Sequence, residues 1–199
     1  MSKSLKNHLM IDIETMSNIP GGVIVSIGAA FFDPFDDYTE DFPDDIPLFY
    51  KNVDIDSCLK YGLSINGGTI FFWMDQGKEA REALTDPKPE KIDRVINDFN
   101  RWYWNQRDTI GKQNEIYVWS HGATFDLPFM TAAASKIGKK MPWKYQNARD
   151  TRTLFDLAFK GGKATFEGFG TKHNALHDSL TQVIWVQEAY KNLGVQKSG

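Results

Sequence analysis

The chain has 199 residues, of which 41% are hydrophobic and 25% charged, and this composition is typical of a globular domain rather than of a disordered or membrane-spanning chain. A net charge of −3 counts against a high-affinity module for duplex DNA, but not against an enzyme that holds a few nucleotides in a metal-lined cleft. A single cysteine excludes an internal disulfide, and no apolar run reaches the roughly 18 residues that a membrane span needs. We expect one cytoplasmic domain over residues 1–199, without membrane contact.

The first predicted strand, residues 9–15, is apolar except for two acids, Asp12 and Glu14. Side chains two residues apart on a strand point to the same face, about 7 Å apart, so the two carboxylates project together. Burial of like charges is unfavourable unless a cation neutralises them, and hard divalent cations prefer oxygen ligands. The pattern indicates half of a metal site. The alternative is that Asp12 is an exposed strand residue and that Glu14 begins a loop.

Two further strands are expected next. A turn at residues 17–22 and an apolar run at 23–32 predict an antiparallel partner for the first strand, and a third strand follows at about 48–53. The connection contains seven acids between Asp33 and Asp45, but it lacks the glycine and the final glutamate of a calcium loop. We interpret it as a solvated hairpin loop.

Residues 69–81 predict a capped short helix followed by another helix. Their aromatic residues at 71, 72 and 73 cannot all face one core, and Trp73 is our candidate for a ring that stacks on a base. The alternative is that all three rings are packed. A longer amphipathic helix is expected at 89–104, with apolar residues at helical spacing: Ile92, Val95, Ile96, Phe99 and Tyr103.

The second half of the chain alternates strands and helices. A strand at 115–119 leads into a helix at 125–137, which places Asp126 at a strand-to-helix junction, where open α/β sheets bind their ligands. A basic loop at 138–144, either solvated or in contact with phosphates, precedes a helix that ends near 159 and a glycine-rich link to a last helix at about 175–193. We therefore expect one α/β domain: an antiparallel three-stranded meander extended by parallel strands.

Two histidines near the start of the last helix are candidate bases. His173 and Asp178 are about 140° apart on a continuous helix, so they can converge only if His173 lies on the loop before the helix. His177 is the competing base, but as the helical neighbour of Asp178 it should point about 100° away from it.

The acidic strand pair, the Phe125-Asp126 junction and the His-x4-Asp ending occur in an order that strongly resembles the DnaQ-like 3′-5′ exonucleases of the DEDDh type. Asp12 and Glu14 fall on the first motif of that family, Asp126 on its second, and His173 with Asp178 on its third. The phage exonuclease A and bacterial exoribonuclease branch looks most similar, through Asp-Ile-Glu-Thr-Met at 12–16, Thr69-x3-Trp73-x2-Gln76-x4-Arg81 and Arg149-Asp150-x-Arg152-Thr153. The resemblance covers residues 8–190.

This resemblance implies an RNase H-like α/β fold, with a mixed five-stranded sheet and helices on both faces. It also implies a metal-dependent exonuclease that removes nucleoside 5′-monophosphates from the 3′ end of single-stranded DNA or RNA, with DNA favoured. Two divalent cations, Mg²⁺ or Mn²⁺, would be held by Asp12, Glu14, Asp126 and Asp178, with His173 as the general base.

The branch motifs add candidate substrate contacts. Trp73 would stack on a terminal base, Arg152 or His121 would hold a phosphate, and Thr15 and Met16 would line the terminal nucleotide. The alternative for Arg149 and Asp150 is a structural ion pair. Two other functions stay open at this point: a non-catalytic module that binds nucleic-acid ends, and a metallohydrolase that acts on small nucleotides.

Overall fold

The computed structural model describes residues 5–85 and 88–197, which form a five-stranded sheet in the order β3-β2-β1-β4-β5. The antiparallel meander consists of β1 (His8–Thr15), β2 (Ile24–Phe32) and β3 (Leu48–Asn52). On the other side of β1 lie two parallel strands, β4 (Tyr117–Ser120) and β5 (Ala148–Asp150). The predicted meander with parallel additions is confirmed.

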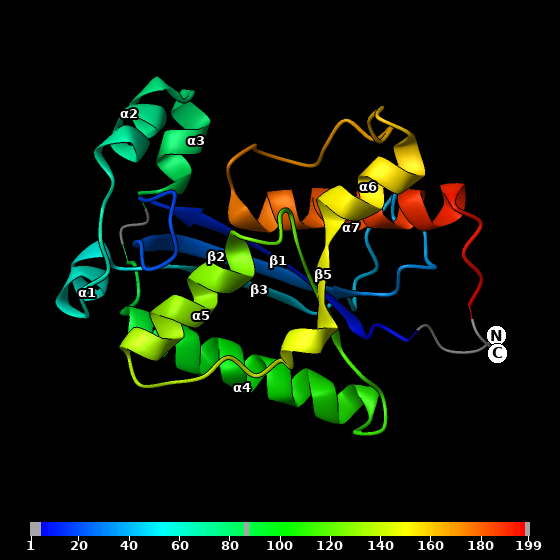
Figure 1. The fold of residues 1–199 in the computed structure, drawn as a ribbon, viewed down its shortest axis with the longest axis horizontal. Helices are drawn as coiled ribbons and strands as arrows, with labels where there is room; N and C mark the ends of the chain where they lie inside the picture. The colour runs from blue at the N-terminus through cyan, green and yellow to red at the C-terminus, as the bar shows by residue number, and fades with distance from the viewer. Residues whose placement is uncertain (1–4, 86–87, 198–199) are drawn as a thin grey trace.

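Helices cover both faces of this sheet, as expected. Figure 1 shows α6 (Thr151–Phe159) and α7 (Ala175–Asn192) on one face, and α4 (Ile92–Ile110) and α5 (Asp126–Lys136) on the other. Three short helices, α1 (Ile55–Lys60), α2 (Gly67–Asp75) and α3 (Lys78–Ala83), follow β3. Helix α4 runs six residues further than predicted and ends at Gly111, whose φ of 96° few other residues adopt.

The alternation of β1 divides the interior into two apolar cores. Leu9, Ile11 and Ile13 point into the core under α4 and α5, whereas Met10 packs against residues of α7. Asp12 is two residues beyond Met10, so it shares the α7 face. The two acids of β1 therefore lie on the face of the sheet that α7 covers.

A glycine in β2 allows α7 to lie directly on the sheet. Gly28 is the register partner of Asp12, and a Cβ at this position would lie 2.2 Å from the backbone carbonyl of Ala175. Because backbone atoms of a helix end cannot move aside cheaply, only glycine permits this approach. The first turn of α7 is thereby held over Asp12.

We expect Gly28→Ala to destabilise the fold by about 2–3 kcal/mol, because the added methyl group would push the start of α7 away from the sheet. Urea unfolding would measure the change. Gly67→Ala is the matched control, since a Cβ there meets nothing within 4 Å, and its effect should stay within about 0.5 kcal/mol. Equal stabilities of the two variants would contradict the packing argument.

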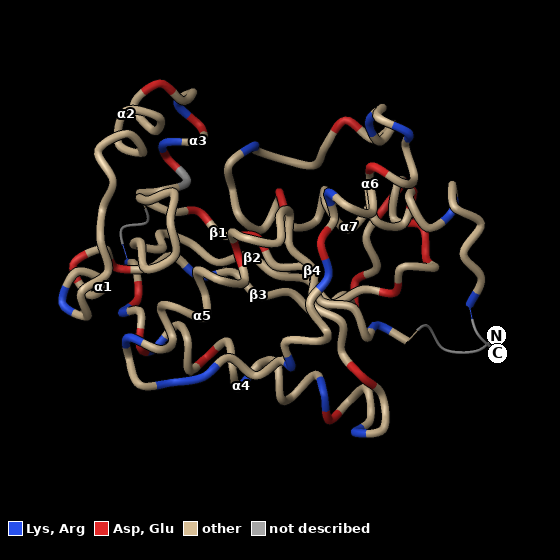
Figure 2. The backbone as a smooth tube through the Cα atoms, in the orientation of Figure 1, with Lys and Arg blue, Asp and Glu red and all other residues tan. Residues whose placement is uncertain are grey.

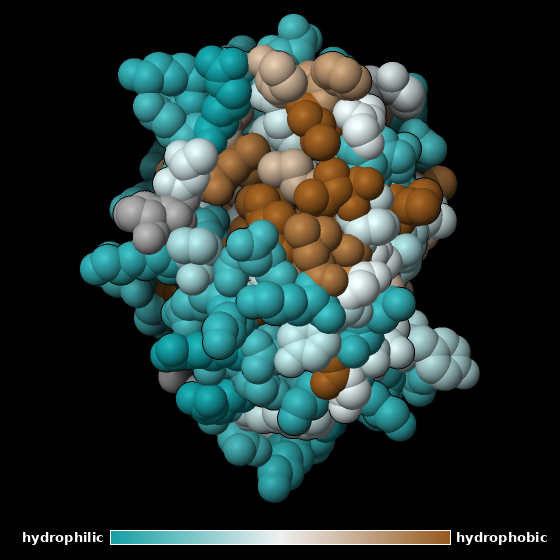
Figure 3. All heavy atoms as spheres, turned by 90° about the vertical axis from the view of Figure 1, so that its left-hand side faces the viewer, coloured by the Kyte–Doolittle hydropathy of each residue, from teal (hydrophilic) through white to brown (hydrophobic). Residues whose placement is uncertain are grey.

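Acidic and basic residues are interspersed along the described backbone (Figure 2). None of the described helices is long and apolar enough to cross a membrane. Figure 3 looks at the end of the molecule where α1 and α2 lie, and apolar side chains gather there in one patch. The exposed apolar residues of α2 are Ile70, Phe71, Phe72 and Met74.

Candidate active site

The acids predicted from the sequence meet in one place. A pocket of about 490 Å³ is lined by Asp12 and Glu14 of β1, Asp126 at the start of α5, and His173 and Asp178 at the start of α7. These residues come from three segments that are far apart in the sequence. The arrangement sets four carboxylates and one imidazole around a shared space.

Asp126 reaches the pocket because the β1–β4 ladder is short. The two strands pair only from His8 to Met10, so β4 leaves the edge of β1 open further along. Asp126, in the first turn of α5, fills this opening and accepts a hydrogen bond of 3.2 Å from the backbone N–H of Ile13. Its carboxylate is therefore fixed beside Asp12 and Glu14, at the strand-to-helix junction that the sequence predicts.

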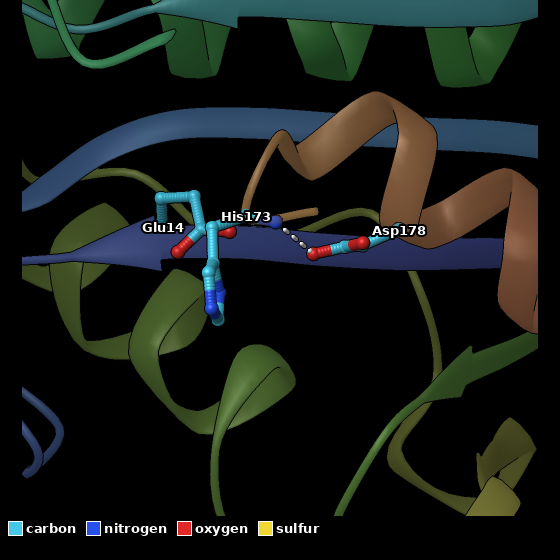
Figure 4. Close-up of side chains that lie close together, drawn as sticks. All are labelled: Glu14, His173 and Asp178. Carbon is cyan, nitrogen blue, oxygen red and sulfur yellow. Dashed lines mark hydrogen bonds between the residues drawn. The ribbon is translucent and has the colours of Figure 1, made fainter. Parts of the chain in front are cut away.

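The loop before α7 brings His173 to the pocket, as the sequence analysis required. Asn174 caps the helix with its side chain, so His173 lies just outside it, in the left-handed region with a φ of 62°. The backbone N–H of His173 donates to Asp178 Oδ2 at 2.9 Å, a contact that Figure 4 draws. The hydrogen bond stabilises a backbone conformation that is uncommon for histidine.

Three of these side chains lie especially close together. Ligand atoms of Glu14, His173 and Asp178 are all within 4.8 Å of one another, and Figure 4 shows the three side chains grouped beside β1. Asp12 and Asp126 line the same pocket but lie outside this tightest group. Carboxylate oxygens are suitable ligands for Mg²⁺ or Mn²⁺, so the acids of the pocket fit a hard divalent cation.

His177 is turned away from the pocket, as predicted. Its Nδ1 accepts a hydrogen bond of 2.9 Å from the backbone N–H of Thr171, and its ring packs edge-on against Phe169. The role visible for His177 is to order the loop that carries His173.

Burial raises the pKa values of the four acids in the pocket, and repulsion between neighbouring carboxylates adds to the rise for Asp12 and Glu14. Burial raises the pKa of Glu14 to about 8, and the carboxylates of Asp178 and Asp126 contribute to this rise. Burial likewise raises the pKa of Asp126 to about 7, and it raises the pKa values of Asp12 and Asp178. For Asp12, the other three acids of the pocket add to the effect. A cluster of this kind is stabilised by positive charge placed among its oxygens.

The metal-free protein should therefore lose stability as the pH rises from about 6 to about 8.5. Its folded state keeps protons on Glu14 and Asp126 that the unfolded chain, with pKa values of 4.5 and 3.8, has already released. Since the folded state binds more protons, the free energy of unfolding falls until the pH passes the raised pKa values. We expect the midpoint of thermal unfolding in EDTA to drop by about 5–10 °C, and Mn²⁺ to restore most of it. An unfolding midpoint in EDTA that does not change between pH 6 and pH 8.5 would contradict the repulsion among the acids of the pocket.

A second pocket, of about 400 Å³, adjoins the first and shares Glu14, Phe72 and His173 with it. Its other lining residues include Thr15, Asn66 and Trp73. The expectation that Trp73 presents its ring for stacking is wrong: the residue is only 5% exposed, and its Nε1 donates to the carbonyl oxygen of Thr15 at 2.9 Å. Phe72 is 45% exposed and offers the open ring instead.

Two other residues of the Thr69-x3-Trp73-x2-Gln76-x4-Arg81 motif, Gln76 and Arg81, have structural roles. The Gln76 side chain donates to the carbonyl oxygen of Phe72 within the last turn of α2, and Arg81 of α3 donates to that of Met74, so the second bond ties α3 to the end of α2. The Trp73 contact with Thr15 holds α2 beside the pocket.

The other predicted substrate contacts divide into two groups. His121 and Arg152 line the acidic pocket, and His121 Nδ1 lies 2.9 Å from the Thr151 hydroxyl. Met16 lines neither of these two pockets and packs against the core under α4 and α5, so its position does not support the predicted nucleotide contact.

Asp150 caps α6, and the Arg149 guanidinium lies over the Tyr117 ring. The two do not form the ion pair considered as their alternative role, within the residues described.

The sequence analysis missed two residues that shape the site. Gln182 of α7 donates to Asp12 Oδ1 at 2.7 Å, and Gly28 allows α7 to approach. The available signals were a glycine inside a strand and a polar residue one helical turn after Asp178.

Comparisons with known proteins agree with this geometry. Residues 7–190 match the family described as the Rv2179c-like 3′-5′ exoribonuclease domain. Among solved structures, the nuclease domain of 3′hExo, a DEDDh family member bound to rAMP, has a similar fold: the TM-score is 0.53 at 13% identity, over 98% of this chain and 96% of that chain. A search of curated proteins found no match.

The expected RNase H-like fold is confirmed by this structural similarity, and the family match covers nearly all of the chain. The chain therefore belongs to the Rv2179c-like 3′-5′ exoribonuclease domain family and is a 3′-5′ exonuclease.

Proposed function

We propose that this protein hydrolyses single-stranded nucleic acid from its 3′ end and releases nucleoside 5′-monophosphates, using two divalent cations held by Asp12, Glu14, Asp126 and Asp178. One observation carries the proposal: the four acids and His173 line a single pocket although they come from three separate segments. Burial and the neighbouring acids raise the pKa values of Asp12 and Glu14, and burial raises that of Asp126, so a cation among their oxygens would favour the ionised carboxylates. Mg²⁺ or Mn²⁺ would supply Lewis-acid stabilisation of the charge that develops on the scissile phosphate.

His173 is the proposed general base. Burial lowers its pKa below the usual 6.5, so its imidazole is neutral at pH 7 and is free to take the proton of the attacking water. Its ring packs edge-on against Phe72 and Trp73, with centroid distances of 5.5 and 5.8 Å. These contacts orient the ring without occupying its nitrogens.

The remaining pocket residues suit the substrate. Arg152 and His121 stand at the edge of the acidic pocket, where a guanidinium and an imidazole can hold a phosphate. The adjoining pocket combines the open Phe72 ring with the polar side chains of Thr15 and Asn66, which suits a terminal nucleoside. The acidic pocket would thus take the phosphate of a 3′-terminal nucleotide, and the adjoining pocket would take its nucleoside.

RNA is the first substrate to test. The sequence favoured DNA through its similarity to phage enzymes, whereas the matching family is described as an exoribonuclease and the similar nuclease domain was solved with rAMP. These two findings support RNA. Discrimination would depend on contacts to the 2′-hydroxyl group.

A time course on 3′-labelled and 5′-labelled single-stranded RNA and DNA, with Mg²⁺, Mn²⁺ or EDTA, tests the proposal. A label at the 3′ end should be released at once as a mononucleotide. An oligonucleotide labelled at its 5′ end should become shorter by one nucleotide at a time. EDTA should stop both reactions. Metal-dependent binding without product would instead indicate a module that only binds nucleic-acid ends. Hydrolysis of dinucleotides or phosphate esters without hydrolysis of oligonucleotides would indicate an enzyme for small substrates.

A further inference from the structure

A buried amide lies against Asp12 and has no part in the mechanism above. Gln182 belongs to α7 and follows Asp178 by one helical turn, so both side chains face the same way. Its side chain is only 5% exposed, and its Nε2 donates to Asp12 Oδ1 at 2.7 Å. This hydrogen bond joins residues that are 170 positions apart in the sequence.

The bond selects one arrangement of the Asp12 carboxylate. A neutral amide donor holds one oxygen of the carboxylate and adds no charge, so the other oxygen stays available to a cation. Without the donor, Asp12 would face only the repulsion of Glu14, Asp126 and Asp178 on its polar side, and its side chain could rotate away.

The amide oxygen of Gln182 indicates that the residue is present for its contact with Asp12 and not for stability alone. Gln182 Oε1 is buried and has no hydrogen-bond partner among the described residues. A buried polar atom without a partner is unfavourable for folding. Stability alone does not account for a glutamine here, because an apolar side chain of similar size would avoid that cost.

Helix α7 also provides a comparison. Gln187 is equally buried at 5%, but its Nε2 donates to the carbonyl oxygen of Asp33 and its Oε1 accepts from the backbone N–H of Tyr38. Both of its polar groups are satisfied by main-chain atoms away from the acidic pocket. Gln187 therefore represents a purely structural glutamine on the same helix.

We propose that Gln182 is a positioning residue that fixes the carboxylate of Asp12 for divalent-cation binding and thereby sets the cation affinity of the active site. The inference rests on the proposed function, because it assumes that Asp12 is a cation ligand. It adds a residue outside the DEDDh motifs to the machinery of the site.

The test compares Gln182→Met with Gln187→Met in the full chain. The readout is the Mn²⁺ concentration that gives half of the maximal thermal stabilisation, and the Mn²⁺ dependence of nucleotide release is measured beside it. We expect Gln182→Met to raise both half-saturating concentrations by about 10-fold or more, with most of the turnover recovered at saturating Mn²⁺. Gln187→Met should lower the unfolding midpoint in EDTA and leave both concentrations within about twofold of the wild type.

The outcomes separate this inference from the proposed function. If wild-type protein gains no stability from Mn²⁺, the cation site itself is wrong. If the wild type responds and Gln182→Met responds at the same Mn²⁺ concentration, or if Gln187→Met shifts as far, the positioning role of Gln182 is wrong. Gln182→Leu repeats the measurement with a branched side chain should the methionine variant fail to fold, and the same criterion applies to it.

Discussion

Asp12→Asn is expected to abolish nucleotide release while the fold stays intact. Asp12 shares its pocket with three other acids, and an amide in its place removes a negative ligand without changing the shape of the side chain. The rate at saturating substrate and Mn²⁺ should fall by about 10³-fold or more, since the site would lose part of its cation binding and of the charge stabilisation that depends on it. A quenched time course of mononucleotide release measures this loss.

The same substitution should make the metal-free protein more stable at pH 8. A buried aspartate at this position must either carry charge beside three other acids or take up a proton; a neutral asparagine avoids both costs, and its Oδ1 can still accept the hydrogen bond from Gln182. We therefore expect a higher unfolding midpoint in EDTA than for the wild type, and a smaller gain from Mn²⁺. A variant that loses activity and gains stability cannot be dismissed as misfolded.

Asp54→Asn is the control for this experiment. Asp54 caps α1 through its side-chain oxygen, and asparagine caps helices equally well, so the activity and the midpoint should both stay near the wild-type values. Wild-type turnover in Asp12→Asn would remove Asp12 from the active site. A loss of stability in EDTA at pH 8 would contradict the repulsion among the four acids.

The site residues whose placement could be predicted from the sequence are those for which the local pattern allows only one arrangement. Alternation in residues 9–15 leaves Asp12 and Glu14 on one face of β1, and this holds whatever packs above them. Helix rotation requires His173 to lie outside α7 if it is to meet Asp178, and the structure places it there. The order of strands and helices was also sufficient to predict an antiparallel meander extended by parallel strands, although it did not predict the short strand β5.

Long-range packing decided what the sequence could not. The choice among the rings at 71–73 depends on where α2 sits, and the hydrogen bond from Trp73 to Thr15 turns that ring inward and Phe72 outward. Met16 was expected beside the nucleotide because it follows the acids, but a register shift between Glu14 and Thr15 interrupts the alternation of β1, and Met16 lies against the core. The Gln182 contact with Asp12 spans 170 residues and has no local pattern.

His173→Asn should reduce turnover by at least about 10²-fold, which is the usual contribution of a general base. Asparagine tolerates the left-handed backbone conformation that His173 adopts, with a φ of 62°, so the loop and its hydrogen bond to Asp178 should persist. The variant therefore removes the imidazole and leaves its support in place. Mn²⁺ should still stabilise this variant if His173 acts on the proton rather than on the cation, and a matched loss of Mn²⁺ binding would make His173 a ligand.

His177→Asn completes the argument because the two histidines lie four residues apart in similar exposure. The Oδ1 of asparagine can replace the Nδ1 of His177 as acceptor for the backbone N–H of Thr171, so the loop before α7 should keep its shape. Turnover should stay within about threefold of the wild type, far above that of His173→Asn. The reverse ranking would move the base to His177. It would also require the helix to turn by about a quarter of its circumference, because His177 now points towards Phe169 and away from the acids.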